Sequence, residues 1–104
     1  MIKYKFYKNG YEVIGHSKKL ICAQFSAMNY VFEGIILELD KNAKCKDSET
    51  GSGYTALLID NKDLFNLLDD FKKSISNWAK SEIKSNDYKI ESFNNYIKWG
   101  NIDN

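Results

Sequence analysis

The stretch IKYKFYKNGYEVI (residues 2–14) has the pattern of a β-hairpin. Apolar and polar residues alternate on both sides of Asn9-Gly10, and an Asn-Gly dipeptide is well suited to a tight turn between antiparallel strands. Alternation of this kind is typical of strands that bury one face and leave the other in water. The sequence therefore predicts an antiparallel hairpin as the first element of the fold.

A long helical pattern follows the hairpin. Between Leu20 and Leu39 the apolar residues recur at the spacing of an α-helix. The stripe predicted to face the core is Ile21, Phe25, Met28, Phe32, Ile35 and Leu39. A helix of this length is expected to be the main core element.

The rest of the chain predicts a second hairpin and a second helix. Two short extended runs, residues 43–47 and 54–59, flank a Gly-Ser-Gly turn. Asp60 and Asn61 are good N-caps for a helix whose apolar positions are Leu64, Leu67, Leu68, Phe71, Ile75 and Trp78. The order β-β-α-β-β-α predicts a two-layer α+β domain, with a four-stranded, mostly antiparallel sheet and two helices covering one face.

Composition limits the class of protein and its location. A chain of 104 residues suits one compact domain. Charge is balanced at 15 basic and 14 acidic residues, and the basic residues are all lysine, so no bidentate arginine is available for direct nucleic-acid recognition. The N-terminus does not resemble a signal peptide, and no run approaches the ~20 apolar residues of a membrane span. We expect a soluble, cytoplasmic protein without a membrane partner.

The cysteines do not form a recognisable metal motif. Two cysteines in a cytoplasmic chain are expected to be reduced thiols. One histidine with two cysteines lacks the paired spacing of a zinc site, so we expect no metal and no cofactor. Cys45 is interpreted as an ordinary strand residue. Gly51 and Gly53 lack the third glycine of a phosphate loop, which argues against nucleotide binding there.

His16 and Cys22 are candidates for a catalytic pair. At ~100° per residue around the helix, Cys22 falls beside the apolar stripe, on the side of Ser26, Asn29 and Glu33. It also lies in the first helical turn, where unpaired backbone N–H groups and the helix dipole stabilise a thiolate. A short loop can return His16 to the helix start, which meets the geometric minimum for a nucleophile and its base. The alternative is two unrelated residues on either side of a loop.

Two segments carry a resemblance to a known family. IGHS (residues 14–17) and ICAQFSAM (residues 21–28) resemble the bacterial ribosomal-processing cysteine protease family called Prp. In that family a Gly-His leaves the second strand, and a Val-Cys-Ala-Ala-Val-Ser-Ala-Leu-like segment begins the first helix. DYKI (residues 87–90) resembles the family's closing segment. The resemblance predicts a Prp-like protease domain over residues 1–91 and a C-terminal extension over residues 92–104.

The resemblance implies a specific activity. Family members are cysteine endopeptidases that remove the N-terminal extension of a large-subunit ribosomal protein, the one numbered twenty-seven, during ribosome maturation, and the family implies a homodimer. Matched residue by residue, Cys22 corresponds to the nucleophile and His16 to the base. The residues expected to bind substrate are Ser26, Gly15, Ser17 and Lys19.

The sequence departs from the family in two places. The family's loop between histidine and cysteine is longer and rich in glycine, whereas here it contains only residues 17–19. Lys19 stands where the family usually has an aspartate. These departures leave open an alternative function, a non-catalytic relative that binds the peptide or a ribosomal surface.

The C-terminal extension is rich in aromatic residues. Phe93, Tyr96, Ile97 and Trp99 suit an interface with a partner or a second copy. The same residues also suit a satellite cluster that covers the domain's own sheet. The sequence leaves both possibilities open.

Overall fold

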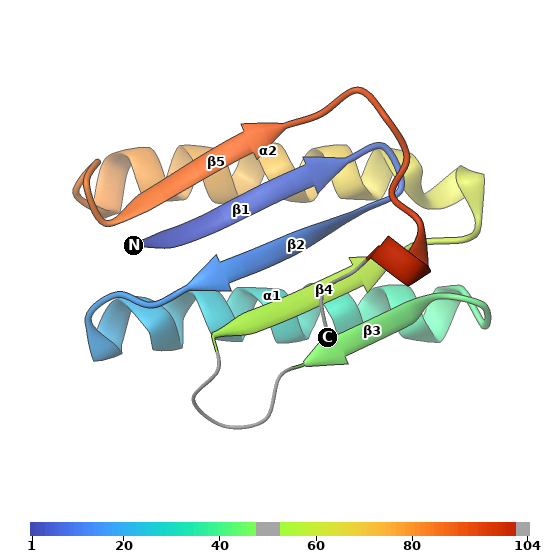
Figure 1. Cartoon of the computed structure of the whole chain (residues 1–104), viewed down its shortest axis with the longest axis horizontal. Helices are drawn as coiled ribbons and strands as arrows, with labels where there is room; N and C mark the ends of the chain where they lie inside the picture. The colour runs from blue at the N-terminus through green and yellow to red at the C-terminus, as the bar shows by residue number, and fades with distance from the viewer. Residues whose placement is uncertain (48–52, 102–104) are drawn as a thin grey trace.

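The computed structural model describes residues 1–47 and 53–101 (Figure 1). The elements in chain order are β1 (Ile2–Tyr7), β2 (Gly10–Gly15), α1 (Lys19–Leu39), β3 (Lys44–Asp47), β4 (Tyr54–Leu58), the 3-10 turn η1 (Lys62–Leu64), α2 (Phe65–Glu82), β5 (Tyr88–Ser92) and the 3-10 turn η2 (Trp99–Asn101). Both helices lie on the same face of one sheet, which confirms the predicted α+β, two-layer class. Gly51 and the following Ser52, predicted to form the second hairpin turn, lie outside the described residues.

The sheet has five strands instead of the four predicted. Their order is β3-β4-β2-β1-β5. β2 pairs antiparallel with β1 and β4, and β3 pairs antiparallel with β4, so the sheet is mostly antiparallel as expected. The additional strand is β5, which pairs parallel with β1, Ile2 lying opposite Tyr88. It arises because α2 carries the chain across the sheet from β4 to the free edge of β1.

The core-facing side of α1 differs from the predicted stripe. Phe25 and Phe32 are buried as expected, but the next core residue is Ile36, which has no exposed surface. Ile35 and Leu39 are 48% and 55% exposed. Spacings of seven and four residues keep Phe25, Phe32 and Ile36 on one side, whereas Ile35 lies about 100° away from Ile36.

The second helix begins close to the predicted position. The Asn61 side chain accepts a hydrogen bond from the backbone N–H of Asp63 at 3.0 Å, so Asn61 caps η1, which leads into α2. Leu68 and Ile75 are buried in the core, but Leu67 is 37% exposed and lies outside it. The prediction for α2 was therefore correct in position and wrong at one apolar residue.

Aromatic side chains join the two layers. The rings of Phe32 on α1 and Phe71 on α2 stack with centroids 4.2 Å apart, and Phe25 meets Trp78 edge to face at 5.3 Å. Tyr4 of β1 lies against Phe25, with centroids 5.5 Å apart. Offset and edge-to-face ring pairs add to the stabilisation from burial. These contacts hold α1 against the sheet beside α2 and so fix where its first turn lies.

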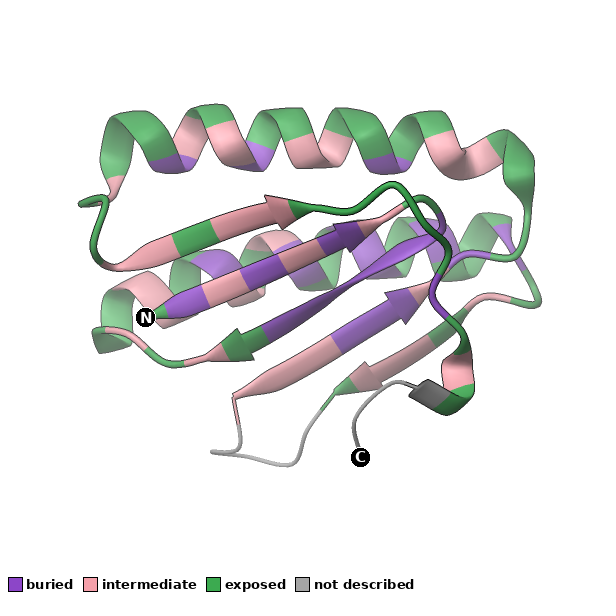
Figure 2. Cartoon of the chain, turned by 45° about the horizontal axis from the view of Figure 1, so that its top comes forward, coloured by how far each residue is buried: buried purple, intermediate pink, exposed green. Residues whose placement is uncertain are grey.

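The aromatic extension packs on the other face of the sheet. Ile97 is buried against Ala56, with Trp99 beside it. The Asn9 side chain donates to the Ile97 carbonyl at 3.0 Å and accepts from the Ile97 N–H at 2.9 Å. The extension therefore covers the domain's own sheet, the second of the two possibilities for this segment (Figure 2).

α1 is more apolar than the sequence analysis allowed. By length and composition alone it could cross a membrane, a test that core helices of water-soluble proteins also pass. Its buried residues are Phe25, Asn29, Phe32, Glu33 and Ile36. The helix therefore serves here as a core helix on the sheet.

Candidate active site

A groove of about 610 Å³ lies between the first turns of α1 and the neighbouring strands β2 and β4. Its lining includes five of the six predicted site residues: Gly15, His16, Lys19, Cys22 and Ser26. The sixth, Ser17, contributes through its backbone, as described below. Ligand-binding clefts typically have volumes of a few hundred to about 1,000 Å³. The fold therefore brings the predicted residues together in one place of suitable size.

The Cys22 thiol is held at the start of α1. The helix begins at Lys19, its N-cap Lys18 makes no side-chain capping bond, and Cys22 lies half-buried in the first turn. Its Sγ accepts a hydrogen bond from the N–H of Ser17 at 3.2 Å and donates one to the Ser17 carbonyl at 3.3 Å. The sulfur thus faces the loop that carries His16, at the end of the helix where the dipole favours negative charge.

The His16 side chain is exposed and lies against Gly53, the residue just before β4. A Cβ atom on Gly53 would lie 2.6 Å from His16 Nε2, too close for a side chain to fit. Gly53 also has a φ of +63°, a backbone conformation that favours glycine, so both the space and the backbone require glycine at this position. The backbone is anchored by a bond from the Gly15 N–H to the Gly53 carbonyl at 2.8 Å. The Met1 amino group donates to the carbonyl of His16.

The thiol and the imidazole share the groove but are not paired. Within residues 1–47 and 53–101, the hydrogen bonds of Cys22 Sγ are those to the Ser17 backbone, not to the His16 ring. Apo sites often hold catalytic partners apart until substrate binds. A rotation of the Cys22 or His16 side chain within the groove would be needed to bring the two groups together.

Sequence reasoning missed Asn29 as a groove residue. The sequence analysis placed Asn29 on the same side of the helix as Cys22 but did not include it among the site residues, yet it lines the groove and is only 4% exposed. The Tyr4 hydroxyl donates to its side-chain oxygen, which fixes the amide beneath the site. The available signal was a polar residue between Phe25 and Phe32 on the sheet-facing side of an apolar helix.

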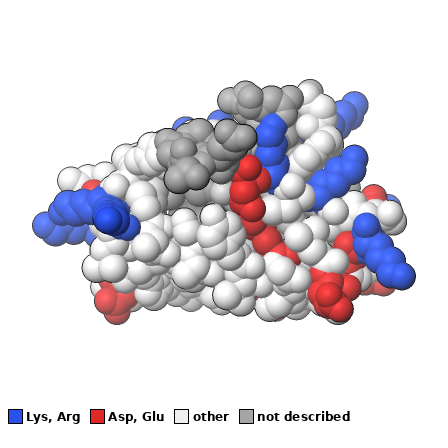
Figure 3. Space-filling model, turned by 90° about the horizontal axis from the view of Figure 1, so that it is seen from below, with Lys and Arg blue, Asp and Glu red and all other residues white. Residues whose placement is uncertain are grey.

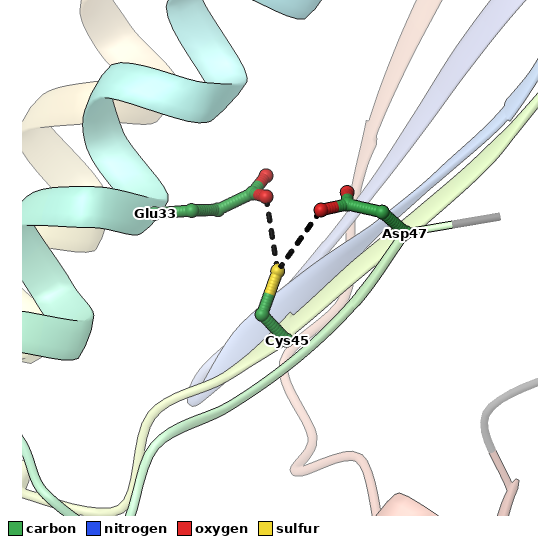
Figure 4. Close-up of side chains that lie close together, drawn as sticks. All are labelled: Glu33, Cys45 and Asp47. Atoms are coloured by element: carbon green, nitrogen blue, oxygen red, sulfur yellow. Dashed lines mark hydrogen bonds between the residues drawn. The ribbon is translucent and has the colours of Figure 1, made fainter. Parts of the chain in front are cut away.

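A second polar cluster lies next to the groove (Figure 4). Cys45 Sγ donates to Glu33 Oε1 at 3.0 Å and lies 3.9 Å from Asp47 Oδ2, while the Tyr11 hydroxyl donates to Glu33 Oε2 at 2.5 Å. The sequence analysis interpreted Cys45 as an ordinary strand residue and overlooked this cluster. Its ligand atoms lie within 4.8 Å of one another, close enough to share a metal ion.

The protonation of this cluster favours a hydrogen-bond network. Burial raises the pKa of Glu33 to about 7, although the hydrogen bonds from Cys45 and Tyr11 act in the opposite direction. Burial and the neighbouring Glu33 carboxylate raise the pKa of the Cys45 thiol. Metal ligation requires the thiolate. A thiol that keeps its proton is instead suited to donate to the Glu33 carboxylate.

The raised pKa of Glu33 predicts a pH-dependent stability. Because Glu33 titrates at about 7 when folded and near 4.5 when unfolded, the folded state retains a proton that the unfolded chain releases between these values. The free energy of unfolding should therefore fall by up to about 3 kcal/mol as pH rises through this window. Urea unfolding at about pH 4 and about pH 8, on either side of the window, measures this fall.

Two variants test the assignment of this fall to Glu33. In Glu33→Gln, the part of the fall that Glu33 causes should be absent, since glutamine does not titrate. Glu82→Gln, at an exposed position at the end of α2, should keep the wild-type profile. An unchanged profile in Glu33→Gln would contradict the assignment.

Comparison with known proteins supports the fold. No protein-family model matches the sequence, and no curated protein sequence matches it. The crystal structure of the essential ribosomal processing protease Prp from S. aureus, in complex with a covalently linked product peptide, is similar with a TM-score of 0.70. At 14% identity, the match covers 89% of this chain and 100% of that one. A hypothetical protein from Staphylococcus aureus is similar with a TM-score of 0.64, at the same identity and coverage. The predicted likeness to Prp is therefore confirmed at the level of the fold.

Proposed function

We propose that the protein is a Prp-like cysteine endopeptidase that removes the N-terminal extension of the large-subunit ribosomal protein numbered twenty-seven. The observation that carries this proposal is that Cys22 and His16 line the same groove at the start of α1. The shared fold with a ribosomal processing protease supports it. The protein would act in the cytoplasm during ribosome maturation, as a homodimer and without a cofactor.

The mechanism proposed for this site is nucleophilic. His16 takes the proton of the Cys22 thiol, and the thiolate attacks the carbonyl carbon of the scissile peptide bond. Backbone N–H groups of the first helical turn stabilise the oxyanion. His16 then gives its proton to the leaving amine, and water hydrolyses the thioester. The first step requires Cys22 to exchange its contact with the Ser17 carbonyl for one with the imidazole.

Incubation with the extended ribosomal protein from the same organism tests the proposal. Intact mass spectrometry should show two products whose masses place the cut within the extension, and the already processed form should remain uncut. Binding without cleavage would contradict the protease and support the non-catalytic relative, which the short loop and Lys19 favour. Neither binding nor cleavage would contradict both functions.

Gly53 should be needed for activity although it carries no functional group. Gly53→Ala would place a methyl group against the His16 ring in a backbone conformation that alanine disfavours. We expect the rate of cleavage to fall by about a hundred-fold, because small displacements of catalytic groups have effects of this size. Gly100→Ala, where an added Cβ meets nothing within 4 Å, should cleave at the wild-type rate. Equal rates for both variants would contradict the placement of His16.

A further inference from the structure

β5 is an edge strand of the sheet, and α2 runs beside it on one face (Figure 1). A groove of about 460 Å³ lies between the two elements. Its lining includes Tyr88, Ile90 and Ser92 of β5 and Lys72, Lys73 and Lys80 of α2. None of the residues that line it also lines the groove that contains Cys22. We call this second surface the β5 groove.

The backbone of β5 has one side open to a further strand. Among the described residues, β1 is the one strand that pairs with β5. In a parallel pair, alternate residues of a strand hydrogen-bond to the neighbouring strand. The Asp87 carbonyl accepts from the Ile2 N–H at 3.0 Å. The Phe93 N–H donates to the Phe6 carbonyl at 2.8 Å. The odd-numbered residues of this segment thus face β1, and the even-numbered residues, which line the β5 groove, turn their N–H and C=O groups to the open edge.

The β5 groove is positively charged. Lys73 and Lys80 are exposed and Lys72 is half-buried, and no acidic residue is among the described residues that line the groove. In the part of the chain that the structure describes, the ion pair made by a lysine is that of Lys3 with Glu91, so the groove lysines have no carboxylate partner there. Charge is not spread evenly over the molecule, since Figure 3 shows a broad area over α1 without charged groups. The groove lysines therefore form a local positive patch beside the open strand edge.

An added strand would use both the edge and the charge. Its backbone would pair with the outward N–H and C=O groups of β5, which is how extended peptides add to a sheet. Successive side chains of a strand point to opposite faces of the sheet. Every second side chain of the added strand would therefore point to the α2 side, where the lysines lie. Acidic side chains at these alternate positions would supply the missing carboxylates.

Two other occupants suit the β5 groove less well. A nucleic acid would offer phosphate oxygens to the lysines, but phosphates are acceptors and leave the C=O groups of β5 unpaired. A second copy paired edge to edge through β5 would bring two sets of lysines together, which like charges oppose. We propose that the β5 groove binds an extended acidic segment of another protein, which pairs with β5 as a further strand. This site is separate from the Cys22 groove and does not depend on protease activity.

Fluorescence anisotropy of a labelled peptide, Glu-Val-Glu-Val-Glu, with the full chain tests the charge of the site. The peptide should bind, and added salt should weaken the binding. Lys73→Gln together with Lys80→Gln should lower the affinity by about ten-fold, since two charge pairs are lost. The matched control is Lys41→Gln together with Lys62→Gln, which removes the same charge at two exposed positions outside the groove and should leave the affinity unchanged.

Backbone methylation of the same peptide tests the pairing with β5. In a strand, the N–H groups of alternate residues point to opposite edges. Two peptides, one N-methylated on its glutamates and the other on its valines, should therefore differ: one should lose binding and the other should keep it. In NMR spectra of the full chain, the unmodified peptide should shift the amide signals of Tyr88–Ser92 and leave those around Cys22 in place.

Several results would overturn the proposal. These are no binding of the unmodified peptide, equal weakening by the control variant, equal binding of the two methylated peptides, or amide shifts around Cys22 in place of β5. A single-stranded polyuridine that binds through Lys73 and Lys80 while the peptide does not would overturn it in favour of a nucleic-acid surface.

Discussion

Replacement of Cys22 by alanine is expected to abolish cleavage of the extended ribosomal protein, whereas Cys45→Ala should leave the rate nearly unchanged. Loss of the nucleophile removes the covalent route, so the fall should be at least about a thousand-fold. The chain supplies its own control, since both cysteines are free and half-buried. Only Cys22 lines the groove, while Cys45 donates to Glu33.

Initial rates of cleavage, followed by intact mass, measure this difference. Circular dichroism of both variants establishes that the fold is retained. Equal activity of Cys22→Ala and the parent would exclude the thiol mechanism. Loss of activity only in Cys45→Ala would move the candidate nucleophile to the cluster with Glu33.

The largest expected effect on stability comes from one of two adjacent isoleucines on α1. Ile36 is fully buried, and Ile36→Ala should lower the free energy of unfolding by about 2–5 kcal/mol. Ile35 is 48% exposed, and Ile35→Ala should cost less than about 1 kcal/mol. The two variants remove the same atoms from neighbouring positions of one helix, so their difference reports burial alone.

Urea unfolding of the two variants at one pH gives the comparison. A larger loss in Ile35→Ala than in Ile36→Ala would mean that α1 is rotated on the sheet relative to this structure. It would also support the apolar stripe predicted from the sequence, which included Ile35 and left out Ile36.

The isoleucine pair shows where sequence patterns reach their limit. The first hairpin could be predicted because alternation over residues 2–14 and the Asn9-Gly10 turn are local signals. The side of α1 that faces the core could not be predicted, because the helix is apolar on its outer side as well as its inner side. Helical spacing therefore selects both Ile35 and Ile36. β5 was missed as a sheet strand because its partner β1 lies far away in the sequence and is reached only through α2.

Some residues of the candidate site could likewise be predicted from local patterns, and others could not. His16 and Cys22 are separated by six residues, so their approach could be predicted from the strand end and the helix start. Gly53 and Asp47 belong to the second hairpin, which reaches the groove because β4 pairs with β2 from much earlier in the chain, and no local pattern reveals that pairing. Glu33 gave one usable signal, a charged residue on the sheet-facing side of α1, but its contact with Cys45 depends on where β3 lies.

The central claim is that His16 activates Cys22. Residue-resolved alkylation by limiting iodoacetamide, read by peptide mass mapping, tests it most directly because both thiols compete in the same molecule. Cys22 should react faster than Cys45 in the parent protein, and His16→Ala should slow Cys22 while leaving Cys45 unchanged. Alkylation of Cys22 at the same rate with and without His16 would contradict a catalytic pair.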